Sequence, residues 1–447
     1  MGDRVSVNVS DLITYSRDYW PIALHWLLNG EVPALPDVVV WPENTGEVSL
    51  VLKTAYELGL YVYPYGGGSG VLGAAVPEKG GVVVDLKRMR SLALNEDDLI
   101  VEAEAGVNGY YLESFLNKRG YTLGHIPQSL YPSTVGGWIS TKATGQFSTK
   151  YGGIEDMLLG LEAVLPTGEV VCVKPHPRSA VGPDLSQLFV GGEGVFGVVT
   201  KAWLKVHPYP EERIQLSYVH DSFEEALMAV KKILRKGARP AVIRVYDVIE
   251  TKRHFYAFEE AYGKVLSIYI VEGSSSLARA EAEIVEREVG GKALGGEPVE
   301  HWLETRFNVK EAPEFSPFGV VFDTIEVAAP WSRVVELYEK FREAVNSIDG
   351  VLFVSAHASH FYPQGACLYF TFAGVPRGDP TEFYNRVWDA AMKTTLDCGG
   401  TISHHHGVGR QRKTWLREAV GTSYDLLKTV KEALDPKGLM NPGNWGL

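Results

Sequence analysis

The chain is poor in cysteine and has no long apolar run. Its 447 residues include three cysteines, Cys172, Cys367 and Cys398, at wide and irregular intervals. No C-x-x-C spacing occurs, so neither a disulfide framework nor a structural zinc site is expected. Residues 1–30 mix charges among short apolar runs. We therefore predict neither a secretory signal nor a membrane-spanning helix, and we expect a cytoplasmic protein.

Positive charge is also scarce. The chain has 43 Lys and Arg against 55 Asp and Glu, a formal net charge of −12. Nucleic acids and anionic membranes attract clustered Lys and Arg, so no nucleic-acid partner is expected, and peripheral contact with a membrane is left open. A small anionic substrate would have to be bound by locally placed cations. We expect the protein to form a homodimer.

The length predicts two or three domains, and the pattern of elements changes once along the chain. Up to about residue 205, strands and helices alternate in a way that predicts an α+β domain of two lobes with a cofactor between them. A proline-stiffened junction follows at 207–210. The later alternation is typical of an antiparallel sheet covered by helices, which would cap the cofactor. We expect an N-terminal helical segment at 1–34, a cofactor domain at 35–207, a substrate or cap domain at 208–400 and a C-terminal segment at 401–447.

Apolar periodicity and turn residues predict the individual elements. Helices are expected at 45–58, with its N-cap at Thr45, and at 107–119, 222–236, 275–289, 331–347 and 413–434. Strands are expected at 38–42, 60–63, 82–86, 99–106, 213–218, 241–247, 265–271, 320–327 and 367–372.

A glycine-rich turn, Pro64–Val71, opens directly from the end of the strand at 60–63. Glycine adopts positive φ without steric cost, and its backbone N–H groups can converge on an anionic oxygen. Taken alone, such a turn is as readily an ordinary loop as a phosphate site.

Three further segments follow in order: Pro132–Thr141, Tyr151–Asp156 and Gly191–Thr200. With the glycine-rich turn they resemble the FAD-binding domain of the vanillyl-alcohol-oxidase/PCMH superfamily of flavoenzymes. The resemblance implies a two-lobed PCMH-type FAD-binding domain at 35–207. Covalent members tether the flavin to a histidine in this loop, and none occurs between Gly66 and Gly70. We therefore expect FAD to be bound non-covalently.

The resemblance implies a set of residues in contact with FAD. They are Tyr65, Gly66, Gly67, Gly68, Ser69, Gly70, Val71, Gln128, Ser129, Ser133, Thr134, Gly136, Gly137, Thr141, Glu193, Gly194, Val198 and Val199.

Within the superfamily, residues 35–447 are most similar to the alkyldihydroxyacetonephosphate synthase family. The similarity is specific at 133–141, 182–184, 329–331, 362–370 and 403–409. That family exchanges an acyl for an alkoxy group through a flavin N5 adduct, without net redox change. The resemblance implies an active-site tyrosine, a substrate arginine, a supporting arginine and a histidine run, which correspond here to Tyr362, Arg306, Arg244 and His404, His405 and His406.

The residues themselves support part of this assignment. Side chains of successive residues alternate on an extended backbone, so the three histidines cannot all reach one metal, and no metal is expected. One or two of them, His405 first, are predicted to carry protons, although a packed structural loop is the alternative. The phenol of Tyr362 is a poor base unless nearby cations or imidazoles lower its pKa. We expect Arg306 to bind the anionic substrate; for Arg244, a substrate role and an ion pair with Asp247 both remain open.

A second branch has the same domain order, the D-lactate, glycolate and D-2-hydroxyglutarate dehydrogenases. Its metal-dependent members use a Gly-Glu-His-Gly turn and a histidine pair, whereas here the turn reads His-His-His-Gly and the pair is reduced to His360, with Tyr369 near the second position. We favour oxidation of a small D-2-hydroxy acid such as D-lactate, with hydride transfer to flavin N5 and a separate electron acceptor, because hydride transfer is the commoner use of this architecture. The local residue match favours the synthase reaction, and a non-enzymatic flavin-binding protein is the third alternative.

Overall fold

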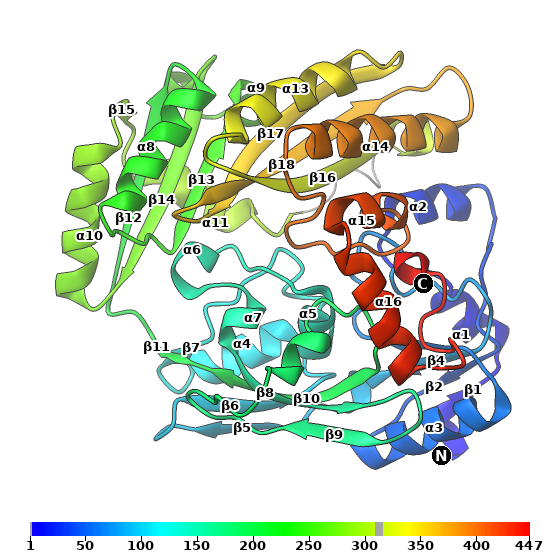
Figure 1. Ribbon diagram of the computed structural model, residues 1–447. Helices are drawn as coiled ribbons and strands as arrows, with labels where there is room; N and C mark the ends of the chain where they lie inside the picture. The colour runs from blue at the N-terminus through cyan, green and yellow to red at the C-terminus, as the bar shows by residue number, and fades with distance from the viewer. Residues whose placement is uncertain (1, 309–315) are drawn as a thin grey trace. The chain divides into compact units, whose positions relative to one another are not determined.

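The computed structural model describes residues 2–308 and 316–447, and the chain divides into two compact units (Figure 1). Unit 1 comprises Met1–Gly145, Gly153–Pro208 and His405–Leu447. Unit 2 comprises Gln146–Gly152 and Tyr209–His404. The histidine run is therefore divided after His404, and the C-terminal residues belong to the same unit as the glycine-rich turn.

The first sheet of unit 1 has the strand order β1-β2-β4-β3. Strand β4 pairs parallel with both β2 and β3, and α3 (Thr45–Leu58) is the crossover between β2 and β3. The predicted bounds of α3 are confirmed, but its N-cap is Asn44 and not Thr45: the side-chain oxygen of Asn44 accepts from the N–H of Glu47 at 3.0 Å. Buried apolar side chains of α3 pack against the strands and close this core. The strands are β1 (Val5–Ser6), β2 (Val38–Val40), β3 (Val62–Tyr65) and β4 (Val82–Asp85).

The second sheet of unit 1 is antiparallel, with the order β5-β6-β10-β8-β9. Helix α5 (Val135–Thr141) packs against β6 and β10 of this sheet. Its strands are β5 (Leu92–Asn95), β6 (Ile100–Glu104), β8 (Leu158–Val164), β9 (Val170–Val173) and β10 (Val198–Lys205). The other elements of this part are α1 (Val9–Thr14), α2 (Pro21–Leu28), α4 (Gly109–Asn117), α5 (Val135–Thr141), α7 (Ile154–Met157) and the pair β7 (Tyr121–Thr122) and β11 (His207–Pro208).

The C-terminal part of unit 1 extends its first sheet. The prediction of one helix at 413–434 is wrong, because Gly421 takes a left-handed φ of 58° and separates α15 (Lys413–Val420) from α16 (Ser423–Leu434). The residues after α16 pair with β3: the N–H of Val62 donates to the carbonyl of Leu439, and the carbonyl of Val62 accepts from the N–H of Asn441. The last residues of the chain thus satisfy the edge of the strand that leads into the glycine-rich turn.

Unit 2 is built on a seven-stranded antiparallel sheet of order β15-β12-β14-β13-β17-β18-β16. Helices cover it, so the predicted α+β class with a helix-covered antiparallel sheet is confirmed. The strands are β12 (Glu212–His220), β13 (Val242–Tyr246), β14 (Val265–Gly273), β15 (Lys292–Ala293), β16 (Val321–Pro330), β17 (Val351–Phe361) and β18 (Gly365–Gly374). The helices are α6 (Ser148–Tyr151), α8 (Phe223–Arg235), α9 (Val248–His254), α10 (Ser275–Glu288), α11 (Glu297–Thr305), α13 (Val334–Asn346) and α14 (Pro380–Asp397).

One face of this sheet is an apolar core. Phe341 of α13 stacks on Phe370 of β18 with ring centroids 3.7 Å apart, and both side chains are almost fully buried. Burial of each ring contributes about 2–3 kcal/mol. Tyr384 and Trp388 of α14 donate to the buried carboxylate of Asp323, which satisfies the polar group on this face. Because side chains alternate along a strand, the residues between these core positions point to the opposite face.

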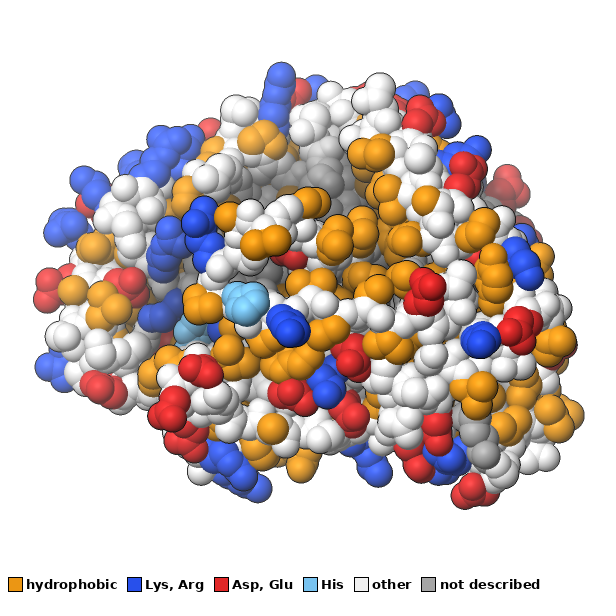
Figure 2. Space-filling model, turned by 60° about the horizontal axis from the view of Figure 1, so that its bottom comes forward, with side chains coloured by type: hydrophobic (Ala, Val, Ile, Leu, Met, Phe, Trp, Pro, Cys, Tyr) orange, Lys and Arg blue, Asp and Glu red, His pale blue; other side chains and the backbone are white. Residues whose placement is uncertain are grey.

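The surface carries charges of both signs. Figure 2 shows acidic and basic side chains interspersed with apolar ones over the face it presents. Among residues 2–308 and 316–447, no helix combines the length and apolar character needed to cross a bilayer.

Candidate functional site

A row of polar side chains crosses four neighbouring strands of unit 2, on the face opposite the apolar core. Glu326 of β16 is the register partner of Tyr369 on β18, Tyr369 is the partner of His357 on β17, and His357 is the partner of Tyr246 on β13. The ring of His357 stacks on that of Tyr369 at 4.8 Å. Burial raises the pKa of Tyr246 to about 12, so this phenol stays neutral at ordinary pH.

Arg244 extends this row. Its Nε donates to the hydroxyl of Tyr246 at 2.7 Å, and its Nη2 lies 2.6 Å from Nε2 of His357. Because a guanidinium only donates, Nε2 of His357 is the acceptor and the imidazole is neutral in this arrangement. Burial alone would raise the pKa of Glu250, but the hydrogen bond and charge of His254, together with the charge of Arg253, hold it below its usual range.

The alternative of an Arg244–Asp247 ion pair is wrong. Asp247 lies three residues further on, beyond the end of the strand, and its carboxylate caps α9 by accepting from the N–H of Glu250 at 2.9 Å. Arg244 instead points to the polar row.

Trp302 of α11 brings the two predicted substrate arginines to one place. The guanidinium carbons of Arg244 and Arg306 each lie 5.5 Å from the centroid of its ring. Arg306 is the C-cap of α11, and its Nη1 donates to the carbonyl of Leu303 at 2.5 Å. We did not predict Trp302; the available signal was its position four residues before Arg306 on one helix, where side chains are neighbours.

Tyr362 stands at the turn between β17 and β18. Its N–H donates to the carbonyl of Gly365 at 2.9 Å, and its own carbonyl accepts from the indole N–H of Trp331 at 3.0 Å. A Cβ on Gly365 would overlap the carbonyl oxygen of Ala329, so only glycine fits there. The hairpin therefore fixes the base of the Tyr362 side chain on rigid backbone.

His404 contacts this tyrosine. Its Nε2 lies 2.8 Å from the hydroxyl of Tyr362. The backbone N–H of His404 donates to Glu326 at 2.5 Å, and the hydroxyl of Ser403 donates to the same carboxylate at 3.2 Å. Glu326 is fully buried, so it anchors the backbone that carries the imidazole. We did not predict Glu326, although a carboxylate inside an apolar strand sequence was a signal.

His360 supports His404 from a β-bulge. The register of β17 against β18 shifts between Ser359 and Phe361, and His360, the extra residue, has a φ of 50°. Bulges redirect a side chain. The His360 ring stacks on that of His404 at 5.1 Å, and its Nδ1 lies 2.7 Å from the hydroxyl of Ser148. His405 and His406 lie in unit 1, half-buried, with ring centroids 4.6 Å apart.

In unit 1 the glycine-rich turn lies directly against the second predicted FAD-contacting stretch. A Cβ on Gly67 would overlap the carbonyl of Pro132, and one on Gly66 would press on Oγ1 of Thr134. Gly68 has a φ of 65°. The glycines are therefore required here by close approach and by a left-handed conformation.

The other residues predicted to contact FAD occupy several environments in unit 1. Thr134 caps α5, the hydroxyl of Ser133 accepts from Trp138, and the hydroxyl of Thr141 donates back to Gly137. Val198 is part of the core beneath the first sheet. The remaining positions are Gly136 packed on Ala105, Gly194 packed on Pro64, Tyr65 with its hydroxyl on the carbonyl of Arg17, Val199 buried in β10, Ser69, Gly70, Val71 and Ser129 half-buried, and Gln128 exposed.

Glu193 holds the returning C-terminal segment. Its carboxylate accepts from the N–H groups of Val408 and Gly409, both at 2.9 Å, from the Asn444 amide at 3.2 Å and from the Trp445 indole at 2.5 Å. Burial raises the pKa of Glu193, and these donors oppose that effect.

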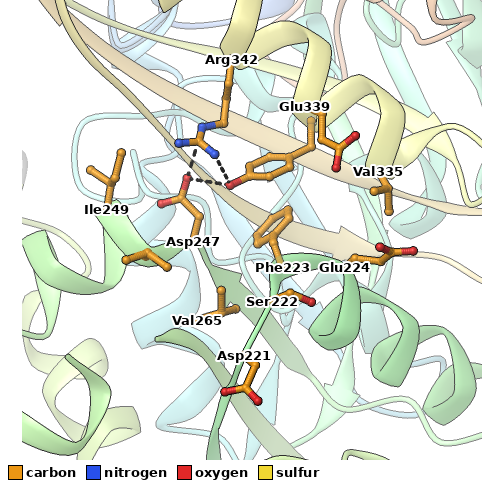
Figure 3. A pocket seen from close by; sticks show the side chains of 12 residues that line it. Asp221, Ser222, Phe223, Glu224, Asp247, Ile249, Val265, Val335, Glu339 and Arg342 are labelled. Atoms are coloured by element: carbon orange, nitrogen blue, oxygen red, sulfur yellow. Dashed lines mark hydrogen bonds and ion pairs between the residues drawn. The ribbon is translucent and has the colours of Figure 1, made fainter. Parts of the chain in front are cut away.

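A cavity of about 330 Å³ lies elsewhere in unit 2, and Figure 3 shows its lining. Asp247 on its wall accepts from the hydroxyl of Tyr338 at 3.3 Å and from the N–H of Ala356 at 2.8 Å, while Arg342 donates to the same hydroxyl at 2.7 Å. The lining contains none of the predicted site residues. The contacts of Asp247 indicate a structural role.

Replacing Asp247 with alanine should therefore lower the free energy of unfolding by about 2–4 kcal/mol, because it removes a helix cap and leaves buried donors unsatisfied. Denaturant unfolding of the full chain measures this loss. Asp221 lines the same cavity but is largely exposed, and Asp221→Asn should change stability by less than about 1 kcal/mol. Equal effects of the two substitutions would contradict the structural role.

In unit 1 the surroundings of the glycine-rich turn contain unsatisfied polar groups. Oδ2 of Asp18 lies beside the turn, and Nε1 of Trp20, two residues further on, is buried as well; neither atom has a hydrogen-bond partner among the described residues. Buried polar atoms are normally paired, so this environment fits a ligand that carries hydroxyl or phosphate oxygens.

A phosphate-type glycine turn in one unit, and a phenol, imidazole and arginine cluster on an antiparallel sheet in the other, define a flavoenzyme of the PCMH type. The family comparisons agree: the FAD binding domain family matches residues 36–174, and the C-terminal domain family of FAD linked oxidases matches residues 209–445. The chain belongs to the FAD-linked oxidase family.

Individual relatives carry different activities. The chain is 30% identical to the alkyldihydroxyacetonephosphate synthase of Caenorhabditis elegans over 94% of this chain and 77% of that protein. It is 27% identical to the mitochondrial D-lactate dehydrogenase (cytochrome) of Arabidopsis thaliana over 92% of this chain and 73% of that protein. A solved structure of an alkyldihydroxyacetonephosphate synthase superposes with a TM-score of 0.81 at 25% identity, covering 99% of this chain and 83% of that one.

Proposed function

We propose that this protein is an FAD-dependent oxidoreductase that oxidises a small D-2-hydroxy acid such as D-lactate by hydride transfer to the flavin. FAD, held non-covalently, supplies the two-electron acceptor for this reaction. The residues that would hold it are the glycine-rich turn 65–71 and the stretch 132–137, which lie against each other in unit 1. The chain has no histidine in that turn to serve as a covalent tether.

The observation that carries the proposal is the 2.8 Å hydrogen bond between Tyr362 and His404. Oxidation of an alcohol requires removal of the hydroxyl proton, and a paired phenol and imidazole can accept that proton and pass it on. The hairpin fixes Tyr362, and Glu326 fixes the backbone of His404. This pre-organisation reduces the reorganisation needed at the moment of proton transfer.

Arg306 and Arg244 provide the cations that an acidic chain needs to bind an anionic substrate. Both guanidinium groups lie beside Trp302, and the arginine fork matches a carboxylate through two hydrogen bonds. In the proposed reaction Arg306 binds the carboxylate of the hydroxy acid, and Arg244 orients His357 and Tyr246 in the polar row.

A second candidate is the exchange of an acyl for an alkoxy group, as in alkyldihydroxyacetonephosphate synthase. The 30% identity over nearly the whole chain favours it. The same Tyr362–His404 pair would then handle a proton at the carbon of a ketone phosphate, and the arginines would bind its phosphate.

Anaerobic flavin spectroscopy distinguishes the two. The purified full chain is mixed with D-lactate, glycolate and D-2-hydroxyglutarate in the absence of oxygen, and the flavin absorbance is recorded. Bleaching by one of these acids, and not by its L enantiomer where one exists, is the expected result. Exchange of labelled alcohol into an acyl-dihydroxyacetone phosphate without bleaching would replace the dehydrogenase by the synthase.

Replacing Arg306 with lysine should raise KM for the acid about 10–100-fold with little change in kcat. Lysine keeps the charge but loses the two-bond geometry, and a charge-assisted hydrogen bond contributes about 1.5–3 kcal/mol. Steady-state kinetics measures the split between KM and kcat. The matched control is Arg279→Lys, an exposed arginine of unit 2 paired with Glu212, which should leave both constants unchanged. An unaltered KM in Arg306→Lys would remove this residue from the substrate site.

A further inference from the structure

The segment Arg17–Trp20 is bound to the glycine-rich turn within unit 1. The N–H of Tyr19 donates to the carbonyl of Gly70 at 2.8 Å, and the hydroxyl of Tyr65 donates to the carbonyl of Arg17 at 3.0 Å. A Cβ on Gly73, whose φ is 76°, would collide with the ring of Trp20. The N-terminal segment therefore contacts the turn through backbone hydrogen bonds, and Trp20 packs on Gly73 just after the turn.

Two polar groups of this segment remain unsatisfied. Asp18 is 4% exposed, and its Oδ1 accepts from the N–H of Trp20 at 3.1 Å. The N–H of Ala75 also favours the ionised carboxyl, but Oδ2 has no partner with hydrogen-bond distance and angle among the described residues. Nε1 of Trp20 is also buried without a partner there. Leaving such groups unpaired costs about 1–3 kcal/mol each, so their retention calls for an explanation.

Oδ2 of Asp18 faces the glycine-rich turn. A Cβ built on Gly70 would come 3.4 Å from this oxygen and would meet no other atom within 4 Å. The space beside Gly70, where a side chain would lie, is therefore unfilled, and Oδ2 of Asp18 borders it. Both unsatisfied groups belong to the segment that covers the turn expected to bind the FAD diphosphate.

We propose that Asp18 and Trp20 bind FAD, Asp18 by donating from a protonated Oδ2 to an oxygen of the diphosphate and Trp20 by donating from its indole N–H. This inference rests on the proposed use of the turn by FAD. It assigns the N-terminal segment, outside the part matched by the FAD binding domain family, to the cofactor site.

The charge environment favours the protonated form of Asp18. Burial raises its pKa to about 7, opposed by backbone hydrogen bonds and by the charge of Arg410, which itself pairs with Glu78 at 2.9 Å. Tyr65 of β3 also faces the carboxyl, and the two groups disfavour each other's ionised forms. A diphosphate would disfavour the ionised carboxylate further, so FAD should bind with uptake of a proton above about pH 7.

The test measures the affinity of the full chain for FAD between pH 5.5 and 8.5. The flavin is removed from the purified protein, and FAD is titrated back while the quenching of its fluorescence is followed. For the unaltered chain, Kd should rise about tenfold for each pH unit above the pKa of Asp18. Asp18→Asn retains a donor and should have a Kd that changes little with pH. Trp20→Phe should weaken binding about 5–10-fold at every pH.

The outcomes separate this inference from the proposed function. Tyr19→Phe, in the same segment but half exposed, is the matched control and should bind FAD as the unaltered chain does. If Asp18→Asn keeps the pH profile of the unaltered chain, or if that profile is flat, the inference is wrong while FAD binding stands. If the unaltered chain binds no FAD at any pH, the proposed function itself fails.

Discussion

Replacing Tyr362 with phenylalanine should lower the rate of flavin reduction by the substrate by about 10²–10⁴-fold, the usual contribution of a positioned acid or base. The substitution removes one oxygen, which lies 2.8 Å from Nε2 of His404, and leaves the turn backbone unchanged. The lost hydrogen bond is worth about 1 kcal/mol of stability, so folding and FAD content should be nearly unaffected. Rapid mixing under anaerobic conditions measures the reduction rate directly.

Tyr369→Phe is the matched control for this prediction. Its hydroxyl also lies in unit 2 and donates to Thr324 at 2.9 Å, and burial raises its pKa well above the usual range. Its removal should change the reduction rate by less than about threefold, since one neutral hydrogen bond away from the reacting pair is lost. A reduction rate in Tyr362→Phe equal to that of the unaltered chain would exclude the phenol from the chemistry, whichever of the two reactions the protein performs.

The sequence was sufficient to predict the bounds of helices whose apolar periodicity and capping residues indicate the same start and end. For α8, Ser222 accepts from the N–H of Glu225, as a capping residue should, and the predicted and observed bounds differ by one residue at each end. The strand β17 was not predicted, because its second half carries Ser355, His357, Ser359 and His360 where apolar residues mark a strand. Those residues are polar because they face the site, so function obscured the local signal.

The residues of the site could be named from the sequence, but the contacts between them could not be predicted. Tyr362 and His404 are 42 positions apart, and the pairing of β16 with β18, the bridge between Ala328 and Thr401 and the hydrogen bonds of Glu326 bring their segments together. The structure pairs His404 with Tyr362, because Glu326 fixes the turn at that residue, and the ranking of His405 as the first proton carrier stays a prediction. Neither the strand pairing nor the contact of Glu326 with His404 can be recognised from the residues that neighbour them in the sequence.

Contacts between distant parts of unit 1 could not be predicted from the sequence either. Glu193 was predicted to contact FAD because of its position in a resembling stretch, and that stays a prediction. Its carboxylate accepts hydrogen bonds from donors between residues 408 and 445, which the sequence did not indicate. These partners come from more than 200 positions away. A buried carboxylate with so many donors is a structural tie, and its removal should be costly.

Glu193→Ala should lower the free energy of unfolding by about 3–5 kcal/mol and the melting temperature by about 10 °C. The substitution leaves the N–H of Gly409, the indole of Trp445 and the amide of Asn444 without an acceptor in a buried region, each at about 1–3 kcal/mol. Calorimetry measures the loss. Limited proteolysis should release the segment beyond residue 405 early, because its tie to the rest of unit 1 is gone.

The pH dependence and a control sharpen this prediction. Burial raises the pKa of Glu193, so the stability that its folded environment adds is fully present below the unfolded pKa and is lost as pH rises through the folded pKa. Glu193→Gln, which does not titrate, should lack that decline. Glu57→Ala on the exposed side of α3 should change stability by no more than about 0.5 kcal/mol. If Glu193→Ala melted and resisted protease like Glu57→Ala, the C-terminal segment would be held by its apolar contacts and by Lys431, which donates to the carbonyls of Val195 and Met440, and the carboxylate would be free to serve a ligand.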